Sequence, residues 1–363
     1  MRDIHKKEFD TATKIKLHIL REYIKEWLPV FIQKREEFWK NITIYDFFAG
    51  EGKDLEGNQG SPMIIIDELE SHHTMITSKG LNIELVLNDN NRKKIQKLKE
   101  CVGNKNKPYK IIYKEEDFTE LFNELYSDMI KTTRQPKFMF LDQYGIKFIT
   151  PYIFKKITSL KRTDFLFFIS SSFLQRFSEQ KEFQNYLKIS KEEFDKSKPY
   201  HCHRVIFNYF KSQIPTDKEY YLAPFSLRKE KGNVYGLIFG TNHLLGIEKF
   251  MKVAWSIDSN TGEANFNIDK DYIQTEQTSL LGGFGFDTRP NKIQLFEKDL
   301  KKLVTNKKIT TLLDIYKFTY EYGCLPIHAN KVIRELKKIK IINDKIKTVN
   351  SRIHKINNIN LFQ

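Results

Sequence analysis

One carboxylate and two glycines near the start of the chain form the pattern with the clearest chemical meaning. Asp46 ends an apolar run that predicts a strand over 42–46, and Gly50 and Gly52 follow in the next loop. Glycine has no Cβ, so this loop can adopt turn conformations that other residues avoid and can leave room for a ligand against its backbone. An acidic residue at the tip of the strand would then orient a small charged ligand.

Two kinds of phosphate-binding loop are disfavoured by the neighbouring residues. A Walker loop has the pattern G-x-x-x-x-G-K-[ST], whereas Gly52 is followed by Lys53 and Asp54 and lacks the upstream glycine. A dinucleotide-binding loop opens a helix directly, but Ser61 and Pro62, which have the form of an N-cap and a first-turn proline, predict a later helix start. The remaining interpretations are the S-adenosylmethionine loop of class I methyltransferases and an ordinary turn between a strand and a helix.

Apolar runs along the chain predict the sheet that would carry this loop. Helical stretches separate four further expected strands, at 83–87, 109–113, 138–141 and 165–169. Such near-continuous apolar strands are typical of a parallel sheet covered on both faces. Two later runs, 220–225 and 234–239, predict an antiparallel hairpin that closes the sheet. This order predicts an α/β fold, a Rossmann-like class I methyltransferase sheet with parallel strands and a terminal antiparallel hairpin.

The chain carries a large positive charge, with 61 Lys and Arg residues against 46 Asp and Glu residues among 363, a net charge of +15. A surplus of this size favours polyanionic partners such as DNA or RNA, or an anionic membrane surface, although an A+T-rich genome also enriches lysine. No apolar run reaches the roughly 18 residues that a membrane span requires, and the N-terminus is too polar for a signal peptide. We therefore expect a cytoplasmic protein with a nucleic-acid partner.

The three cysteines, Cys101, Cys202 and Cys324, form no C-x-x-C pair, so neither a zinc site nor a disulfide framework is expected. His201 and His203 flank Cys202, but no further ligand accompanies them at metal-binding spacing. We interpret these three neighbours as a partly buried structural cluster at a helix start.

The C-terminal part of the chain is predicted to be helical and basic. A helix, a turn and a second helix are followed by a short apolar pair and a polar hairpin at 343–350, which together resemble a winged helix-turn-helix. Basic side chains of the second helix would then face the DNA major groove: Lys331, Arg334, Lys337 and Lys338. A basic helical tail packed on the main domain is the alternative.

These patterns divide the chain into four parts. Residues 1–40 form an N-terminal helical segment, 41–255 the methyltransferase-like Rossmann domain, 256–306 an insertion or linker, and 307–363 the winged-helix-like domain. The basic residues of the first helix, Lys16 among them, are expected on its solvated face, opposite the apolar stripe.

Several motifs together resemble the three-Cys-motif partner family, TcmP. They are Ile19-Leu20 with Tyr23 and Trp27, the loop from Asp46 to Gly52 followed by Gly60-Ser61-Pro62, the segment Leu141-Asp142-Gln143-Tyr144-Gly145, and Phe239-Gly-Thr-Asn-His243. The resemblance covers most of the chain. It implies a Rossmann-like methyltransferase fold in mobile or defence-type gene neighbourhoods, beside a cysteine-motif protein. The family's fourth-strand motif has a proline where this chain has Gln143, so a fixed φ at the tip is lost.

The leading hypothesis is an S-adenosylmethionine-dependent methyltransferase that acts on nucleic acid, at an exocyclic base amine. The cofactor would be held by Asp46, Phe48, Gly50, Gly52, Asn88, Asp89, Asp117 and Phe118. Asp46 would orient the cofactor's amino group. Asn88 or Asp89 would bind the ribose hydroxyls. Asp117 would accept from the adenine amino group, with Phe118 beside the ring. The alternative for Asp89 and Asp117 is turn capping at the strand ends.

On the acceptor side, Asp142 would hold the target amine, and Tyr144 would stack on an extruded base. A second hypothesis is a noncatalytic nucleic-acid-binding partner that keeps the fold as a scaffold or a cofactor sensor, motivated by Gln143 and by the basic C-terminal helix. A nuclease is a third hypothesis. It would use the cluster Lys114-Glu115-Glu116-Asp117, whose place at a strand end fits cofactor binding better.

Overall fold

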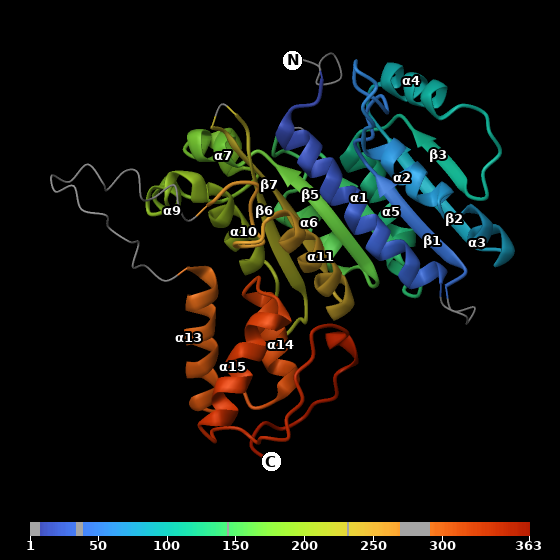
Figure 1. The fold of residues 1–363 in the computed structure, drawn as a ribbon. Coiled ribbons are helices and arrows are strands. Elements are labelled where there is room, and N and C mark those ends of the chain that lie inside the picture. Colours follow the sequence, from blue (N-terminus) through green and yellow to red (C-terminus); the bar gives the residue numbers. More distant parts are fainter. Residues whose placement is uncertain (1–7, 34–38, 144, 231, 269–290) are drawn as a thin grey trace. The chain divides into compact units, whose positions relative to one another are not determined.

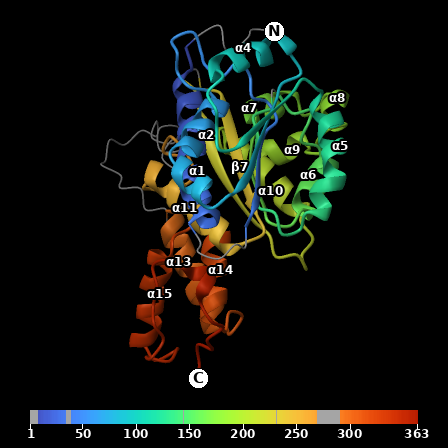
Figure 2. The same ribbon diagram turned by 90° about the vertical axis from the view of Figure 1, so that its right-hand side faces the viewer.

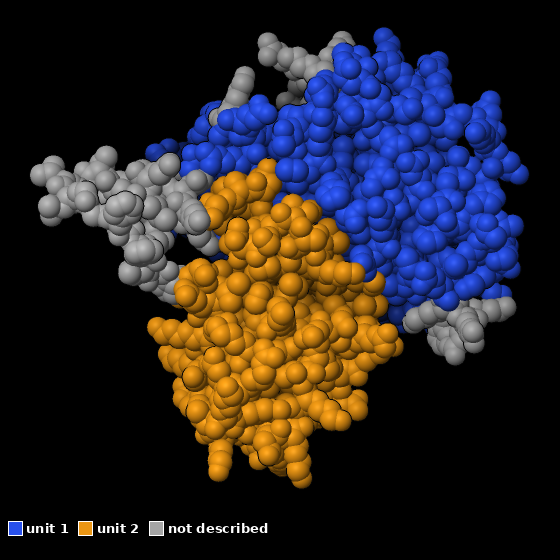
Figure 3. Space-filling model, viewed as in Figure 1, with its two compact units in different colours: residues 1–242 blue, residues 243–363 orange. Residues whose placement is uncertain are grey.

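The computed structural model describes residues 8–33, 39–143, 145–230, 232–268 and 291–363. The chain forms two compact units, residues 1–242 and residues 243–363 (Figure 3). The boundary falls before helix α11 (Leu244–Ile257), whereas the sequence predicts it after residue 255. None of the helices in these described ranges combines the length and hydrophobicity that a membrane span needs.

Unit 1 is built on a seven-stranded sheet of order β3-β2-β1-β4-β5-β7-β6 (Figure 1). Its strands are β1 (Asn41–Asp46), β2 (Asn82–Asn88), β3 (Lys110–Lys114), β4 (Lys137–Leu141), β5 (Thr163–Ile169), β6 (Tyr221–Arg228) and β7 (Val234–Thr241). Strand β1 pairs in parallel with both β2 and β4, while β7 runs antiparallel to β5 and β6. This is the strand order of a Rossmann-like class I methyltransferase sheet, so the predicted fold class of this unit is confirmed.

Helices cover both faces of this sheet. Figure 2 shows α1 and α2 on one side of it and α5, α6 and α10 on the other. The helices of the unit are α1 (Thr11–Ile32), α2 (Ser61–Glu70), α3 (His73–Ser78), α4 (Arg92–Val102), α5 (Phe118–Lys131), α6 (Pro151–Ser159), α7 (Ser171–Phe177), α8 (Lys181–Gln184), α9 (Lys191–Asp195) and α10 (Cys202–Ser212). Both faces of the central strands are therefore buried, as their continuous apolar runs predict.

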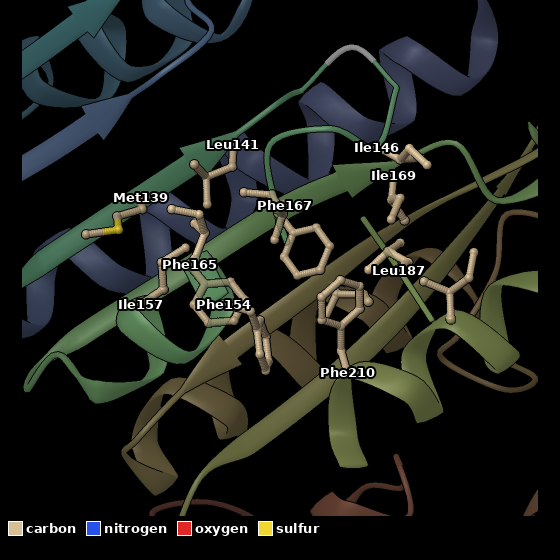
Figure 4. Close-up of a cluster of buried hydrophobic side chains, with 14 of the residues drawn as sticks. Met139, Leu141, Ile146, Phe154, Ile157, Phe165, Phe167, Ile169, Leu187 and Phe210 are labelled. Carbon is tan, nitrogen blue, oxygen red and sulfur yellow. The ribbon is translucent and has the colours of Figure 1, made fainter. Parts of the chain in front are cut away.

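The core on the α6 and α10 face is rich in phenylalanine (Figure 4). The ring of Phe210 on α10 lies 4.9 Å from that of Phe154 on α6 and 5.0 Å from that of Phe167 on β5, centroid to centroid. Offset and edge-to-face contacts of this kind stabilise a core beyond the burial of area alone. This packing fixes β4 and β5, whose carboxyl ends carry candidate site residues.

Helix α1 is anchored to the opposite face by apolar and polar contacts together. The Tyr23 ring lies 4.8 Å from Phe239 of β7, and its hydroxyl donates to Asp164 Oδ2 at 2.7 Å. The predicted helix continues to residue 40, but α1 ends at Ile32, one turn after Pro29. The anchoring at Tyr23 holds the middle of α1 against the sheet.

The cluster predicted at the start of α10 is structural. His203 is buried, its Nδ1 lies 3.0 Å from the Ser171 hydroxyl and its Nε2 lies 2.9 Å from the Leu237 carbonyl oxygen. The ring thus joins α7, α10 and β7. Gly236 is required beside it, because a Cβ at that position would lie 2.0 Å from the imidazole.

Unit 2 contains α11, α13 (Lys292–Thr305), α14 (Leu312–Glu321), α15 (Pro326–Lys338) and the 3-10 turn Ile353–Lys355. Helix α13 occupies part of the predicted linker 256–306. An antiparallel bridge joins Thr311 to Asn360, and the described segment 341–352 contains no strand. The polar hairpin expected at 343–350 is therefore wrong as a pair of strands. The winged-helix assignment is not confirmed.

Side-chain hydrogen bonds from α15 contact the segment that follows this helix. The Asn330 side chain is buried in α15 and donates to the Val349 carbonyl at 3.0 Å and to Asn350 Oδ1 at 2.7 Å. These bonds hold the end of the segment, at Val349 and Asn350, without pairing of strands.

Candidate functional site

The carboxyl ends of β1, β2 and β4 meet at one edge of the sheet. Asp46, the last residue of β1, is in register with Leu87 of β2 and with Phe140 of β4. Asn88 and Asp142 therefore follow immediately beyond Asp46 on its two sides. This is the edge at which parallel α/β sheets bind ligands.

The loop after Asp46 is tied to both neighbouring strands. The Phe47 N–H donates to the Phe140 carbonyl at 3.2 Å, and the Ala49 N–H donates to the Asn88 carbonyl at 2.8 Å. Gly50 and Gly52 have φ values of 67° and 91°, in the left-handed region that glycine adopts without strain.

The two glycines differ in what surrounds them. A Cβ on Gly52 would lie 2.9 Å from Leu98 Cδ1, the end of a flexible side chain of α4, so the φ of 91° is the stronger requirement for glycine there. The turn conformation predicted for Gly52 is thus present, and its close approach to a ligand stays a prediction. Further along the loop, Asp54 accepts from the N–H groups of Phe9 and Asn58, both at 2.8 Å, which holds the loop in one conformation.

Asp46 is fully buried and only half satisfied. Its Oδ1 accepts from the Phe48 N–H at 3.3 Å, whereas its Oδ2 has no hydrogen-bond partner among the described residues. Burial raises the pKa of Asp46 to about 7. The Ser61 hydroxyl opposes this rise from nearby, although it does not meet hydrogen-bond geometry with the carboxylate, and the charges of Asp142 and Asp89 add to the rise. An unpaired buried carboxylate oxygen is costly and would be relieved by a donor group of a ligand.

Asn88 and Asp89 bond within the protein. The Asn88 Nδ2 donates to the carbonyls of Phe47 and Glu116 at 3.2 and 3.0 Å, and its Oδ1 accepts from the Glu116 N–H at 3.1 Å. Its amide is thus used to join three strand ends and is not offered to a ligand. Asp89 Oδ1 caps the turn by accepting from the Asn91 N–H at 2.9 Å, and its Oδ2 lies 3.9 Å from Lys94 Nζ.

Asp117 and Phe118 begin helix α5, shortly after the end of β3. Asp117 is the N-cap of α5, where its Oδ1 accepts from the Thr119 N–H at 2.8 Å. Phe118 is only 2% exposed, and its ring lies 5.2 Å from that of Phe48 and 5.7 Å from that of Phe148. Phe48 and Phe148 are the partly exposed members of this trio, so they offer more surface to a ligand than Phe118 does.

Asp142 forms an ion pair with Lys16 Nζ of α1. The sequence places Lys16 on a solvated face, and this expectation is wrong, because Lys16 is only 4% exposed and its ammonium lies 4.5 Å from the centre of the Phe168 ring. The sequence does contain a signal of this burial, because its spacing places Lys16 on the same helical stripe as the buried Leu20, Tyr23 and Trp27. Tyr144, the predicted partner of Asp142, lies outside the described residues.

Gln143 shapes the loop that follows β4. It is 1% exposed, and its Oε1 accepts from the N–H groups of Phe148 at 3.1 Å and Ile149 at 3.2 Å. Its Nε2 is buried and lacks a partner in the described part of the chain. The edge of the sheet therefore carries two orphaned buried polar atoms on adjacent strands, the acceptor of Asp46 and this donor.

The basic residues predicted to bind nucleic acid lie together on α15 of unit 2. Lys331, Arg334 and Lys338 are exposed, at a spacing that places them on one stripe of the helix, while Lys337 is partly buried. Lys331 Nζ lies 2.6 Å from Glu297 Oε2 of α13, so part of its charge is compensated within the unit.

A shallow depression in unit 1 lies apart from these strand ends. It is lined by α1 and the glycine loop, with Lys14, His18, Arg21, Asn58 and Gln59 among its residues. Arg21 donates to Gln59 at 2.6 Å and to Glu68 at 3.1 Å, so its guanidinium is already occupied. We assign the functional site to the strand ends, where the orphaned atoms lie.

The fold and this edge define the class of the unit as a Rossmann-like methyltransferase sheet. Neither the protein-family models nor the curated protein sequences gave a match to the chain. Among solved structures the chain is similar to Trm1 from Pyrococcus horikoshii in complex with S-adenosyl-L-methionine, with 11% identity and a TM-score of 0.38. That similarity covers 70% of this chain and 62% of the Trm1 chain, which is less than two thirds of Trm1.

Two further solved structures are similar to the chain at comparably low sequence identity. Protein LPL1258 from Legionella pneumophila is 12% identical, over 64% of this chain and 85% of that chain, with a TM-score of 0.37. The O-methyltransferase TomG from Streptomyces achromogenes, in complex with SAM, is 11% identical, over 64% of this chain and 91% of that chain, with a TM-score of 0.33. The fold assignment made above depends on strand order and direction and not on these likenesses.

Asp46→Asn should stabilise the ligand-free protein at neutral pH. The folded-state pKa of Asp46 is about 7 against an ordinary 3.8, so the folded state binds the proton more tightly and the carboxylate destabilises the fold as pH rises through this window. Replacing it should raise the free energy of unfolding at pH 8 by up to about 4 kcal/mol, with little effect near pH 4.

The measurement is urea unfolding of both proteins at pH 4 and pH 8. Asp128→Asn is the matched control, since the Asp128 side chain is 80% exposed on α5. An Asp46→Asn variant that is no more stable than the wild type at pH 8 would show that the buried carboxylate carries no such cost.

Proposed function

We propose that the protein is an S-adenosylmethionine-dependent methyltransferase that acts on nucleic acid, at an exocyclic base amine. The observation that carries the proposal is the buried Asp46 carboxylate with one unpaired oxygen, beside the glycine loop of a sheet with class I methyltransferase strand order. The amino group of the cofactor is a donor of the kind that this oxygen lacks.

The residues at the strand ends fit the cofactor in part. Asp46 would accept from its amino group, and Asp89 Oδ2, which caps no turn, remains for the ribose hydroxyls. Asp117 bonds to the backbone through Oδ1, which leaves its Oδ2 for the adenine amino group. Asn88 takes no part, because its amide is already used, and Phe48 replaces Phe118 as the ring that could pack beside the adenine.

When bound, the cofactor supplies a sulfonium methyl that needs no further activation. The chain's own task is then to align the acceptor amine, which Asp142 would do by accepting a hydrogen bond from it. Tyr144 as a stacking partner for an extruded base remains part of the proposal.

The polymer is proposed from the charge of unit 2. Residues 291–363 contain 16 Lys and Arg residues against 6 Asp and Glu residues, so this fifth of the chain carries most of the net charge. The exposed stripe of α15 concentrates Lys331, Arg334 and Lys338, and such a stripe suits a phosphate backbone. Ile327, 58% exposed, begins the same stripe and adds an apolar contact at the N-terminal end.

A second candidate is a noncatalytic nucleic-acid-binding scaffold or cofactor sensor. The ion pair between Asp142 and Lys16 supports it, because the proposed acceptor-binding carboxylate is already engaged. The resemblance to TcmP adds a neighbouring cysteine-motif protein as its proposed partner. This candidate predicts cofactor and nucleic-acid binding without methyl transfer.

Asp142→Ala should separate the two candidates. Under the enzymatic proposal it lowers methyl transfer from labelled S-adenosylmethionine to DNA or RNA by at least about 100-fold, because the amine loses its alignment. The affinity for S-adenosylhomocysteine, measured by calorimetry, should stay unchanged. Asp128→Ala serves as the control, and transfer that persists in Asp142→Ala would mean that Asp142 is misassigned.

Arg334→Ala combined with Lys338→Ala should weaken nucleic-acid binding for all sequences. Each lost phosphate contact reduces the slope of log affinity against log salt by about 1. Fluorescence anisotropy with duplex DNA and with RNA at several salt concentrations measures this slope. The control is Lys131→Ala combined with Lys196→Ala, which removes the same charge from unit 1. These two side chains are 75% and 73% exposed. Equal slopes in both variants would contradict a role for α15.

A further inference from the structure

Lys16 is a charged residue of unit 1 in an unusually buried position. It lies on α1, it is 4% exposed, and its ammonium contacts the Asp142 carboxylate and faces the Phe168 ring at 4.5 Å. Removing an ammonium from water costs several kcal/mol, which an ion pair repays only in part. A buried lysine at this place therefore needs a reason other than stability.

Anchoring of α1 does not supply that reason. The helix is already held by its apolar stripe and by the Tyr23 hydroxyl, which donates to Asp164. An apolar residue of similar length at position 16 would extend the stripe of Leu20, Tyr23 and Trp27 without the cost of desolvation. The ion pair thus points to a requirement at Asp142 itself.

The two oxygens of Asp142 differ in their environment. Oδ2 contacts Lys16, whereas Oδ1 accepts no hydrogen bond from any described residue, and the side chain keeps 18% of its surface exposed. Lys16 thus fixes Oδ2, whereas Oδ1 remains available to a ligand. Gln143, the next residue, is held through its Oε1 by two backbone N–H groups, so the backbone beneath Asp142 is fixed as well.

The nearby carboxylate of Asp46 is the reason why Asp142 must be held in place. Asp46 lies close enough to Asp142 for the two to repel each other. Without a cation on its other side, Asp142 would turn away from Asp46 toward solvent, and Oδ1 would lose its direction. The charged groups that face Asp142 from the described neighbouring elements are Lys16 of α1 and Asp46 of β1.

We propose that Lys16 is a positioning residue, which holds Asp142 through Oδ2 so that Oδ1 accepts a hydrogen bond from the acceptor amine. This inference rests on the proposed function. In the transfer step the amine nitrogen forms a bond to the methyl carbon, the carbon–sulfur bond breaks with its electron pair going to sulfur, and the nitrogen releases one proton to water. Lys16 touches neither reactant and acts only through Asp142.

The test compares Lys16→Met, Lys16→Arg and Lys25→Met in the full-length protein. Lys25 is the control on the same helix, with a side chain that is 47% exposed and paired with Glu22. Single-turnover transfer should fall about 100-fold in Lys16→Met and recover most of its rate in Lys16→Arg, because arginine restores the cation. Calorimetry with S-adenosylhomocysteine should give the same affinity in all three variants, and in an Asp142→Asn background Lys16→Met should cause no further loss.

The outcomes distinguish this inference from the proposed function. If Lys16→Met transfers methyl groups as fast as the wild type, Lys16 has only a structural role, even if the variant melts at a lower temperature. That result would overturn the inference and leave the proposed function standing. A fall in S-adenosylhomocysteine affinity in Lys16→Met would overturn it too, by assigning Lys16 to the cofactor. A wild-type protein that binds no S-adenosylhomocysteine, or binds it and transfers no methyl group, would overturn the proposed function and the inference together.

Discussion

The burial of the Asp46 carboxylate, with one oxygen unsatisfied, is the constraint on which the rest of the site depends. A charge in this position opposes folding, and the phenylalanine-rich core on one face and the anchored α1 on the other must outweigh that cost. The backbone around it is arranged accordingly: Phe47 and Ala49 bond to the strands on either side, and Gly50 makes the turn. The fold is thus destabilised at a position where a cationic or donor group of a ligand can restore the lost stability.

The two carboxylates at this edge have opposite environments. Asp46 has no cation beside it among the described residues and carries a pKa raised to about 7, whereas Asp142 is paired with Lys16 and stays partly open to solvent. Carboxylates whose surroundings differ in this way take different tasks. In the proposed function Asp46 faces the donor end of the cofactor and Asp142 faces the acceptor. The charge that serves Asp142 comes from α1, which lies outside the alternating strands and helices of the sheet.

The sheet was predictable from sequence because each strand is a continuous apolar run and the glycine loop directly follows Asp46. The site was predictable only in its location. Lys16 and Asp142 meet across 126 positions, and a lysine is assigned to solvent by its residue type even where, as here, its spacing places it on the buried stripe of the helix. The sequence predicts Asn88 as a ligand-binding residue, yet its side-chain amide donates to the carbonyls of Phe47 and Glu116. A pattern of apolar strand residues does not reveal such contacts. The expected hairpin after α15 failed for a similar reason, since Asn330 holds the end of that segment through its side chain.

A crystal structure of the protein with S-adenosylhomocysteine tests the central claim most directly. The account predicts the ligand over the Gly50 turn, with its amino group within hydrogen-bond distance of Asp46 Oδ2 and its ribose toward Asp89. A ligand found elsewhere, a nucleoside triphosphate bound at that turn in preference to it, or an Asp46 carboxylate that stays unpaired at saturating concentration would contradict the account.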